Sequence, residues 1–310
     1  MNYTALLSIA FLFIFLQQTI AQEKHALEGR WDLTVSMDGK EFPSWLEVTH
    51  SGLKTLVGRF VGVSGSARPI SEVKVNGESF NFEIPPQWEE SANYLRVTGS
   101  VKGGNTLSGE MTLPDGKKVA YTGARAPSLK DQKAGTPGKP ISLIDNNSLK
   151  GWKAMGEKNQ WVVENGILKS PASGANLVSE QKFSNFKLRV EFRYPKGSNS
   201  GIYLRGRYEV QIMDSEGNDA ASGQLGGVYG FIAPSEQVAK PAGEWQTYEI
   251  TLIGRMITVV ANGKPIITNQ EIPGITGGAL DSKEGEPGPL LLQGDHGPVE
   301  YRNMIITPLN

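Results

Sequence analysis

The stretch RYEVQIMDSEG, residues 207–217, decides the fold class of the second half of the chain. Apolar and polar residues alternate along its first half. Alternation with a period of two is typical of a β-strand whose two faces meet different surroundings. In such a strand Glu209 and Gln211 share one face, and Asp214 points to the other face.

The same pattern recurs from Ile141 to the end of the chain, in segments such as NFKLRVEFRY, SGIYLR and WQTYEITLIG. Asn165-Gly166 and Asn262-Gly263 are strong signals for two-residue hairpins, because both residues tolerate a positive φ. There is almost no helical period. About 170 antiparallel residues must close on themselves or stack as two sheets, which predicts a jelly-roll sandwich over residues 141–310.

Residues 22–126 form a second β-rich unit with eight short strand-like segments. Asp38-Gly39, Asn76-Gly77 and Asp115-Gly116 separate neighbouring segments, as hairpin turns do. This pattern predicts a smaller up-and-down barrel or sandwich, and the chain is all-β. Residues 127–140 are polar and rich in Gly, Pro and Lys, which indicates a linker. We therefore expect residues 139–310 to fold without the first unit.

The first 21 residues are typical of a signal peptide. An apolar run, Ala5–Leu16, is too short to span a bilayer comfortably, and Thr19-Ile20-Ala21 offers small residues at a cleavage spacing. We expect a periplasmic or secreted protein with no membrane contact after cleavage. The alternative is an uncleaved anchor, since the segment before the run carries no Lys or Arg.

Composition excludes several classes of function. The net charge is −1, so no basic surface for nucleic acid is indicated. Cysteine is absent, which removes disulfides, thiol nucleophiles and thiolate metal sites. The three histidines are His25, His50 and His296, so a three-His zinc site within one unit is impossible, and a metal would need oxygen ligands.

Secreted β-glucanases of the laminarinase type carry a strand similar to the opening one, with acids spaced E-x-D-x-x-E. Here Gln211 stands at the middle position, between Glu209 and Asp214. Five residues of strand separate the outer α-carbons by about 16 Å. A retaining glycosidase needs its two carboxyl groups about 5.5 Å apart. A two-carboxylate glycosidase is therefore poorly supported, and a solvated sheet face remains the alternative.

A second polar group ends the apolar strand in LLLQGDHG, which supplies Gln293, Asp295 and His296. His296 is the only imidazole of the second unit. Its carboxylate neighbour would orient the ring, as carboxylates do for catalytic histidines, if the Gly294–Gly297 turn folds back. The alternative is a histidine that only shapes the loop.

Seven motifs in order resemble one bacterial family almost from end to end of residues 141–309. They are LIDNNSLKGWK, WVVENGIL, LRVEFRYPKGSNSGIYLRGRYEVQIMDS, GGVYGFIAP, KPAGEWQTYEI, ANGKPI and GPLLLQGDHGPVEYRNMIITPL. This family is that of the 3-keto-disaccharide hydrolases, also described as 3-keto-glucoside 1,2-lyases and 3-keto-2-hydroxy-glucal hydratases. The resemblance implies a concanavalin-like jelly roll, 3-keto-glycoside substrates, and a separate dehydrogenase that oxidises the sugar at C3.

A ketone at C3 acidifies the C2 proton, so cleavage needs a base, an enolate stabiliser and an acid for the leaving group. We assign Arg205 as stabiliser, with Glu209 and His296 as base and acid in either order. The residues expected to bind substrate are Gln211, Tyr229, Lys240, Trp245 and Gln293. Tyr229 and Trp245 could instead be core residues, and Lys240 could be solvated.

No cofactor is certain. Glu209, Asp214 and Asp295 form an alternative set that would hold a divalent cation in place of the arginine. Two rival functions remain, a non-catalytic carbohydrate-binding module and a conventional glycoside hydrolase that acts on unoxidised sugars. The sequence does not distinguish the aglycone, the linkage or the oligomeric state.

Overall fold

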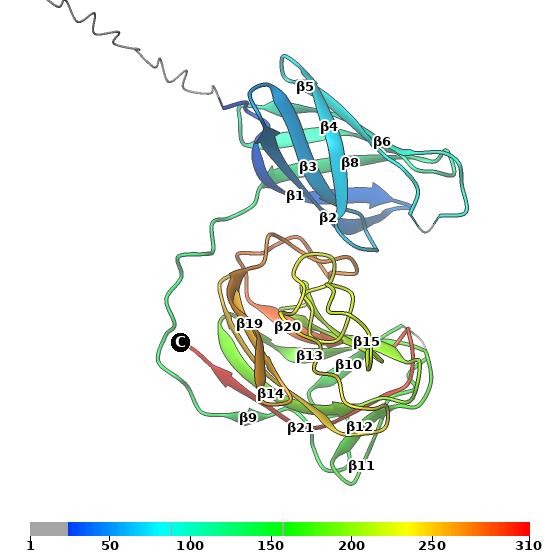
Figure 1. Ribbon diagram of the computed structural model, residues 1–310, viewed down its shortest axis with the longest axis vertical. Coiled ribbons are helices and arrows are strands. Elements are labelled where there is room, and N and C mark those ends of the chain that lie inside the picture. Colours follow the sequence, from blue (N-terminus) through cyan, green and yellow to red (C-terminus); the bar gives the residue numbers. More distant parts are fainter. Residues whose placement is uncertain (1–23, 88, 157) are drawn as a thin grey trace, which may run out of the picture.

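The computed structural model describes residues 24–310 except positions 88 and 157, and this described part consists of strands and loops without an α-helix (Figure 1). The all-β class that the sequence predicts is confirmed. The expected signal peptide, residues 1–21, lies outside the described residues. Within those residues, no helix has the length and apolar character needed to cross a membrane.

The first unit is a closed antiparallel barrel, in which each strand pairs with the next and β8 pairs back with β1. Of the two alternatives predicted, the barrel is correct. The strands are β1 (Gly29–Met37), β2 (Lys40–Ser51), β3 (Thr55–Val61), β4 (Arg68–Asn76), β5 (Ser79–Ile84), β6 (Leu95–Lys102), β7 (Thr106–Thr112) and β8 (Lys118–Arg125). Buried and exposed residues alternate along most of them, so one side of each strand fills the interior.

Two sheets make up the rest of the chain. The five-stranded sheet has the order β10 (Trp152–Met155), β13 (Asn176–Phe183), β20 (Gly288–Leu292), β15 (Asn199–Leu204) and β16 (Tyr208–Met213). The eight-stranded sheet runs β11 (Val162–Glu164), β12 (Ile167–Ser170), β21 (Val299–Pro308), β14 (Phe186–Arg193), β17 (Gln246–Ile253), β18 (Met256–Ala261) and β19 (Lys264–Glu271), with β9 (Ile141–Ser142) beside β21. The hairpin signals are confirmed, since Asn165 and Asn262 both have φ of 51°.

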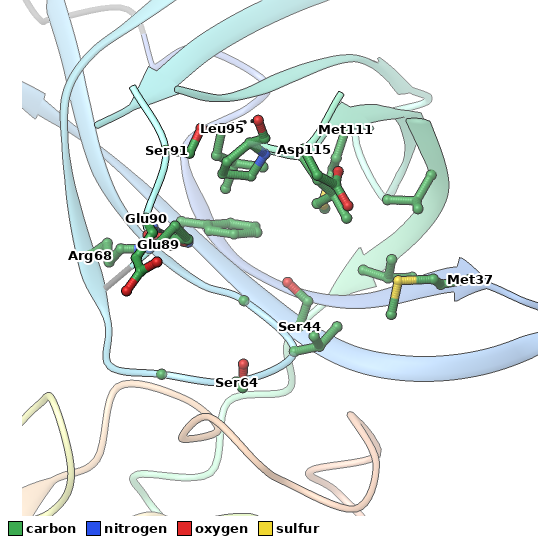
Figure 2. A pocket seen from close by; sticks show the side chains of 18 residues that line it. Met37, Ser44, Ser64, Arg68, Glu89, Glu90, Ser91, Leu95, Met111 and Asp115 are labelled. Atoms are coloured by element: carbon green, nitrogen blue, oxygen red, sulfur yellow. Dashed lines mark hydrogen bonds and ion pairs between the residues drawn. The ribbon is translucent and has the colours of Figure 1, made fainter. Parts of the chain in front are cut away.

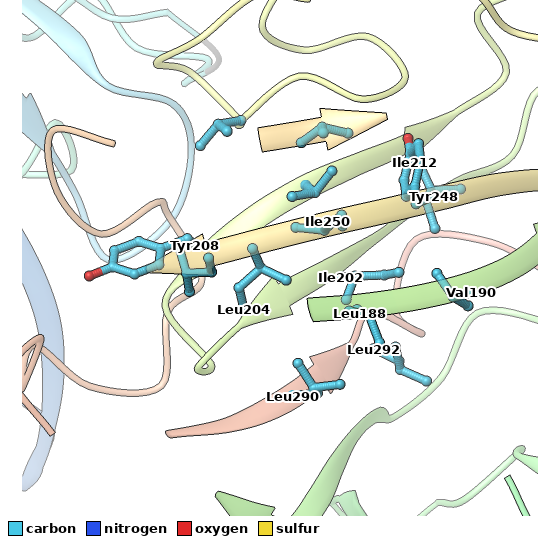
Figure 3. Close-up of a cluster of buried hydrophobic side chains, with 14 of the residues drawn as sticks. Leu188, Val190, Ile202, Leu204, Tyr208, Ile212, Tyr248, Ile250, Leu290 and Leu292 are labelled. Atoms are coloured by element: carbon cyan, nitrogen blue, oxygen red, sulfur yellow. The ribbon is translucent and has the colours of Figure 1, made fainter. Parts of the chain in front are cut away.

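One apolar core lies between the two sheets. Ile202 and Leu292 of the five-stranded sheet and Leu188 and Ile250 of the other sheet belong to it, and all four are at most 1% exposed (Figure 3). Because alternate residues of a strand point to opposite faces, these inward residues fix which residues of β15, β16 and β20 point outward. Those outward residues carry the candidate site.

The linker is more constrained than its composition suggests. Thr136 donates to the carbonyl of Asn310 at 2.6 Å and accepts from the Asn310 amide at 3.0 Å, and Gly138 donates to the Pro308 carbonyl at 2.8 Å. At its start, the Pro127 carbonyl accepts a hydrogen bond from buried Arg255. Residues 127–140 are therefore tied along the surface of the second unit at both ends.

The barrel also contributes a residue to the core of the second unit, which bears on the expectation that residues 139–310 fold alone. Trp45 of β2 is fully buried, belongs to that core, and packs edge-on against Phe231 with ring centroids 5.4 Å apart. A Cβ on Gly274 would lie 2.2 Å from the Trp45 ring, so the backbone approaches the indole closely. Removal of the barrel would therefore expose a cavity in the second unit.

Candidate active site on the outer face of the five-stranded sheet

Strand register brings the polar residues of three strands into neighbouring positions. Glu209 pairs with Tyr203 and Gln211 pairs with Gly201 across β15 and β16, while the Gln293 amide donates to the Gly201 carbonyl at 2.9 Å. Val210 and Ile212 point into the core, as Figure 3 shows for Ile212. Glu209 and Gln211 therefore lie on the outer face, as predicted.

Glu209 is a buried carboxyl group, with 3% of the residue exposed. Its backbone amide donates to the Thr276 hydroxyl at 3.0 Å, and the Tyr203 hydroxyl lies 2.9 Å from its Oε2 atom. Burial raises the pKa of Glu209 to about 8. The hydrogen bond from Tyr203 lowers this pKa, and the nearby Asp295 carboxylate raises it. Glu209 is thus mainly a neutral carboxylic acid at neutral pH.

The Tyr203 hydroxyl supports this protonation state independently. It lies 2.9 Å from Glu209 Oε2 and 3.0 Å from the Gly277 carbonyl, yet it carries one proton and can donate to only one of them. The carbonyl can only accept. If Glu209 is protonated, it donates to the Tyr203 oxygen while Tyr203 donates to Gly277, and both contacts are satisfied. If Glu209 ionises, Tyr203 must turn toward the carboxylate.

Gly201 makes room for the Glu209 side chain. A Cβ at position 201 would lie 2.2 Å from Glu209 Oε1 and 2.8 Å from its Cγ. The carboxyl group therefore lies directly over the backbone of β15, and only glycine allows this position. The Glu209 carboxyl thus covers Gly201 on the face between Gln293 and Gln211.

The two glutamines on either side of Gly201 have buried oxygens without a partner. Gln211 donates from Nε2 to Asn199 at 3.1 Å, which fixes its amide orientation, but its Oε1 atom has no hydrogen bond. The Oε1 atom of Gln293 is likewise buried and unpaired. A buried acceptor without a donor is costly, so these oxygens suit a ligand that carries hydroxyl groups.

Asp295 and His296 lie at the edge of this group and are half exposed. Asp295 Oδ1 is 2.6 Å from His296 Nδ1, with side-chain exposures of 45% and 51%. The two side chains of this turn therefore contact each other, and the carboxylate orients the ring through Nδ1. The Asn176 amide lies 3.5 Å from Asp295 Oδ2, and its carbonyl oxygen accepts from the Gly294 amide at 2.7 Å.

Tyr229 completes the group from the adjacent loop. Its amide donates to the Glu209 carbonyl at 3.1 Å, and the neighbouring Val228 bridges Val210, so the loop extends the sheet beyond β16. Its side chain is half-buried, and burial followed by the Glu209 charge raises the pKa of Tyr229. We call these outward residues, Tyr203, Glu209, Gln211, Tyr229, Gln293, Asp295 and His296, the Glu209 cluster.

Comparison with known proteins gives the family. Residues 139–307 match the family model described as the 3-keto-alpha-glucoside-1,2-lyase-like domain, and this match covers more than half of the chain. The chain belongs to this family. The Glu209 cluster lies wholly within the matched residues, whereas the barrel lies outside them.

Three known proteins are similar to this chain in sequence or in structure. A 3-keto-disaccharide hydrolase of Bacteroides thetaiotaomicron is 28% identical over 36% of this chain and 51% of its own length, so the chain spans about half of that relative. Two candidate glycosyl hydrolases of Parabacteroides distasonis have solved structures. They are 28% and 18% identical, cover 55% of this chain and 89% and 94% of their own, and give TM-scores of 0.46 and 0.44.

The structure places Arg205 apart from the Glu209 cluster and does not bring the predicted enolate stabiliser beside Glu209. Arg205 lies in the turn between β15 and β16 with φ of 54°. Its Nη2 atom donates to the Gly254 carbonyl at 2.9 Å and to the Tyr208 hydroxyl at 3.0 Å. Tyr208 points inward while Glu209 points outward, so the guanidinium is held on the core side (Figure 3).

Lys240 and Trp245 are also placed elsewhere. Lys240 donates from Nζ to the Trp245 carbonyl at 3.1 Å. The Trp245 ring is stacked between the guanidinium groups of Arg193 and Arg302, 4.7 and 3.9 Å from its centroid, which belong to β14 and β21 of the other sheet. The structure therefore does not bring Lys240 and Trp245, both predicted to bind substrate, together with the Glu209 cluster.

The predicted carboxylate set for a metal ion does not assemble. Asp214 accepts from the Gly197 amide at 2.8 Å, and Asp295 is engaged by His296. In the part of the chain that the structure describes, no three His, Asp or Glu side chains lie close enough together to hold a metal ion. Glu209 and Asp295 are near each other, whereas the Asp214 side chain accepts a hydrogen bond from Gly197, just before β15 begins.

Sequence reasoning missed Tyr203, Gly201 and Asn199, which all lie on β15. The signal was present in SNSGIYLR, where Asn199, Gly201 and Tyr203 alternate with Ser200, Ile202 and Leu204. Their alternation places them on one face, and the pairing with β16 then places that face beside Glu209 and Gln211.

Proposed function

We propose that the chain cleaves 3-keto-glycosides by elimination followed by addition of water. The observations that carry this proposal are a buried carboxylic acid, Glu209, and the nearby Asp295 carboxylate, which contacts the imidazole of His296 in the turn after β20. A two-carboxylate glycosidase has no need for an oriented imidazole. Elimination next to a ketone needs a base and an acid of this kind. Membership of the 3-keto-glucoside lyase-like family supports the substrate class.

The proposed reaction balances with the residues of the cluster. His296 Nε2 takes the C2 proton while Asp295 holds the Nδ1 proton, as in other carboxylate–histidine pairs. The C2–H electrons form the C1–C2 double bond, the C1–O bond breaks, and Glu209 gives its proton to the departing oxygen. Water then adds to C1, its proton returns to Glu209, and the imidazolium returns a proton to C2. The products are an alcohol and the free 3-keto sugar.

Substrate hydroxyls would supply the missing hydrogen bonds of the cluster. The Oε1 atoms of Gln211 and Gln293 are buried acceptors without donors, and they lie on either side of Gly201, over which the Glu209 carboxyl lies. Two sugar hydroxyls that donate to them would remove a penalty of about 1–3 kcal/mol for each oxygen. Tyr229 adds a hydroxyl from the loop beside Glu209.

The proposal also states where the protein acts and which reaction supplies its substrate. Export to the periplasm or medium rests on the apolar run Ala5–Leu16 and the small residues that follow it. The 3-keto group must be made by a separate sugar C3 dehydrogenase, because the chain carries no dinucleotide fingerprint.

Incubation of the full chain with a 3-keto-disaccharide and with the unoxidised disaccharide, followed by NMR of the products, tests the proposal. We expect turnover of the oxidised substrate only, with an enone signal or the hydrated 3-keto sugar. Binding without turnover would support a carbohydrate-binding module. Turnover of the unoxidised sugar would support a conventional hydrolase, and either result would reject the elimination mechanism.

A further inference from the structure

The two ends of the barrel are built differently. At one end Arg125 lies 3.7 Å above the Trp31 ring and donates to the Glu28 carbonyl at 2.5 Å, while Leu27 is fully buried beneath. These contacts close that end. At the other end lie the β1–β2, β3–β4, β5–β6 and β7–β8 connections, and described residues of these connections line a cavity (Figure 2).

The open end leads into a cavity of about 640 Å³. Apolar side chains from five strands form much of its wall: Val35, Phe60, Leu95, Met111 and Val119, with Leu113 next to them. Eight-stranded barrels of this kind are wide enough to hold one small ligand, and small-molecule sites in proteins measure about 300–1,000 Å³. The cavity therefore has the size of a site for one drug-sized molecule.

Small residues create this space near the mouth. Ser44, Gly62, Ser64 and Gly65 line the cavity where larger inward side chains would fill it. The Ser44 hydroxyl donates to the Val61 carbonyl at 2.6 Å, so its polar atom is satisfied within the wall. A ligand would meet this part of the wall as an apolar surface.

The opening of the cavity carries a net negative charge. Arg68 donates to Glu89 at 3.0 Å, so one guanidinium is matched by one carboxylate. Glu90 and Asp115 add two further carboxylates around the same opening (Figure 2). A negative opening in a low-dielectric wall attracts cationic groups and repels anions such as fatty-acid carboxylates.

We propose that the barrel is a second binding site, for one apolar small molecule whose polar end is neutral or cationic. The apolar end of the molecule lies against Phe60, Met111 and Val119, and its polar end lies between Glu90 and Asp115. This site is separate from the Glu209 cluster and does not depend on the reaction proposed there.

Fluorescence titration of the full chain with N-phenyl-1-naphthylamine, a neutral apolar probe, tests the proposal. Met111→Trp and Val119→Trp each fill the cavity and should weaken probe binding at least about 10-fold, or about 1.4 kcal/mol. Glu110→Trp places the same side chain on the outer surface next to Met111 and should leave binding unchanged. Circular dichroism of each variant checks that the barrel is folded.

Competition on the wild-type chain tests the charge preference without any core substitution. Dodecyltrimethylammonium should displace the probe at a concentration about 10-fold lower than dodecanoate, both below their critical micelle concentrations. The surface variant Glu90→Lys with Asp115→Lys should reverse this order. Absence of probe binding, unchanged binding in both folded tryptophan variants, or equal displacement by the two amphiphiles would overturn the proposal.

Discussion

Glu209 and Arg205 are four residues apart on one hairpin, and both are at most 3% exposed, but their surroundings differ in kind. Arg205 belongs to a charge network beneath the turn. Tyr208 there donates to Glu284 at 2.5 Å, and Arg255 pairs with Glu284 at 3.1 Å. The network contains its own counter-charge, and the buried Nε atoms of its two arginines lack a partner.

The Glu209 cluster is incomplete by comparison. Its carboxyl group has no cationic partner among the described residues that shift its pKa, and the oxygens of Gln211 and Gln293 have no donor. The difference between Arg205 and Glu209 shows that burial of a charged residue does not by itself identify a functional site. Acceptors left open on one sheet face, next to an acid with a raised pKa, are the more specific signal.

Glu209→Gln should give the largest effect on activity. The amide keeps the shape of the side chain but has no acidic proton to give, so turnover of a 3-keto-disaccharide should fall about 100-fold or more. Steady-state kinetics of Glu209→Gln and of the exposed control Glu216→Gln measure this. If Glu209→Gln retains wild-type turnover, Glu209 is a structural residue like Arg205.

His296→Gln should lower turnover about 10- to 100-fold, because glutamine keeps a hydrogen bond to Asp295 but cannot take a proton from C2. His50→Gln, in the barrel, is the matched control. Turnover of His296→Gln should still fall at high pH, because Glu209 still loses its proton there. An enzyme that keeps its full rate would assign the base to another group.

Gly201→Ala should reduce turnover about 10-fold or more with little loss of stability. The new methyl group would displace the Glu209 carboxyl, and small displacements of catalytic groups are costly. Gly223→Ala is the control, since a Cβ there would touch only Tyr229 at 4.0 Å. Equal kinetics of the two variants would show that the position of Glu209 over Gly201 has no role in the reaction.

Arg205→Ala should affect stability and leave turnover within about twofold of wild type. It removes donors from the Gly254 carbonyl and the Tyr208 hydroxyl, which should lower the free energy of unfolding by about 1–3 kcal/mol. Chemical denaturation and kinetics of the same preparation measure both. A large loss of turnover in a fully folded Arg205→Ala would contradict the division between the two regions.

The pH dependence of stability should show a smaller effect of the same carboxyl group. Because the pKa of Glu209 is raised to about 8, the folded chain holds a proton that the unfolded chain releases near pH 4.5. Stability should therefore fall as pH rises from about 5 to 8. Burial also raises the pKa of Asp32, to about 9, so Glu209→Gln should reduce this slope and not abolish it. Melting temperatures at pH 5 and pH 9 measure the slope.

The sequence predicts this fold well where period-two alternation acts, and less well elsewhere. Alternation places Glu209 and Gln211 on one face because strand geometry leaves no other choice. Arg205 lies in a turn, where its φ of 54° and not the alternation sets its direction. Lys240 and Trp245 follow a long loop, whose path depends on distant contacts with Arg193 and Arg302.

The sequence predicts the contact between the barrel and the second unit only in part. Ser44, Trp45 and Leu46 are buried one after another in β2, which breaks the alternation expected of a barrel strand with a solvated outer side. The adjacent apolar pair Trp45-Leu46 is the sequence signal of burial on both faces. Which surface covers the indole depends on tertiary packing against Phe231, and a local pattern does not contain it.

The pH–rate profile of the wild-type chain tests most directly whether Glu209 acts as a protonated acid. With a 3-keto-disaccharide, kcat/KM should fall about tenfold per pH unit above about pH 8, because ionised Glu209 has no proton to give. Removal of the Tyr203 donor in Tyr203→Phe should move this fall to higher pH, since the bond from Tyr203 lowers the pKa of Glu209. A rate that is constant from pH 7 to pH 10, or the same fall in Glu209→Gln, would contradict the account.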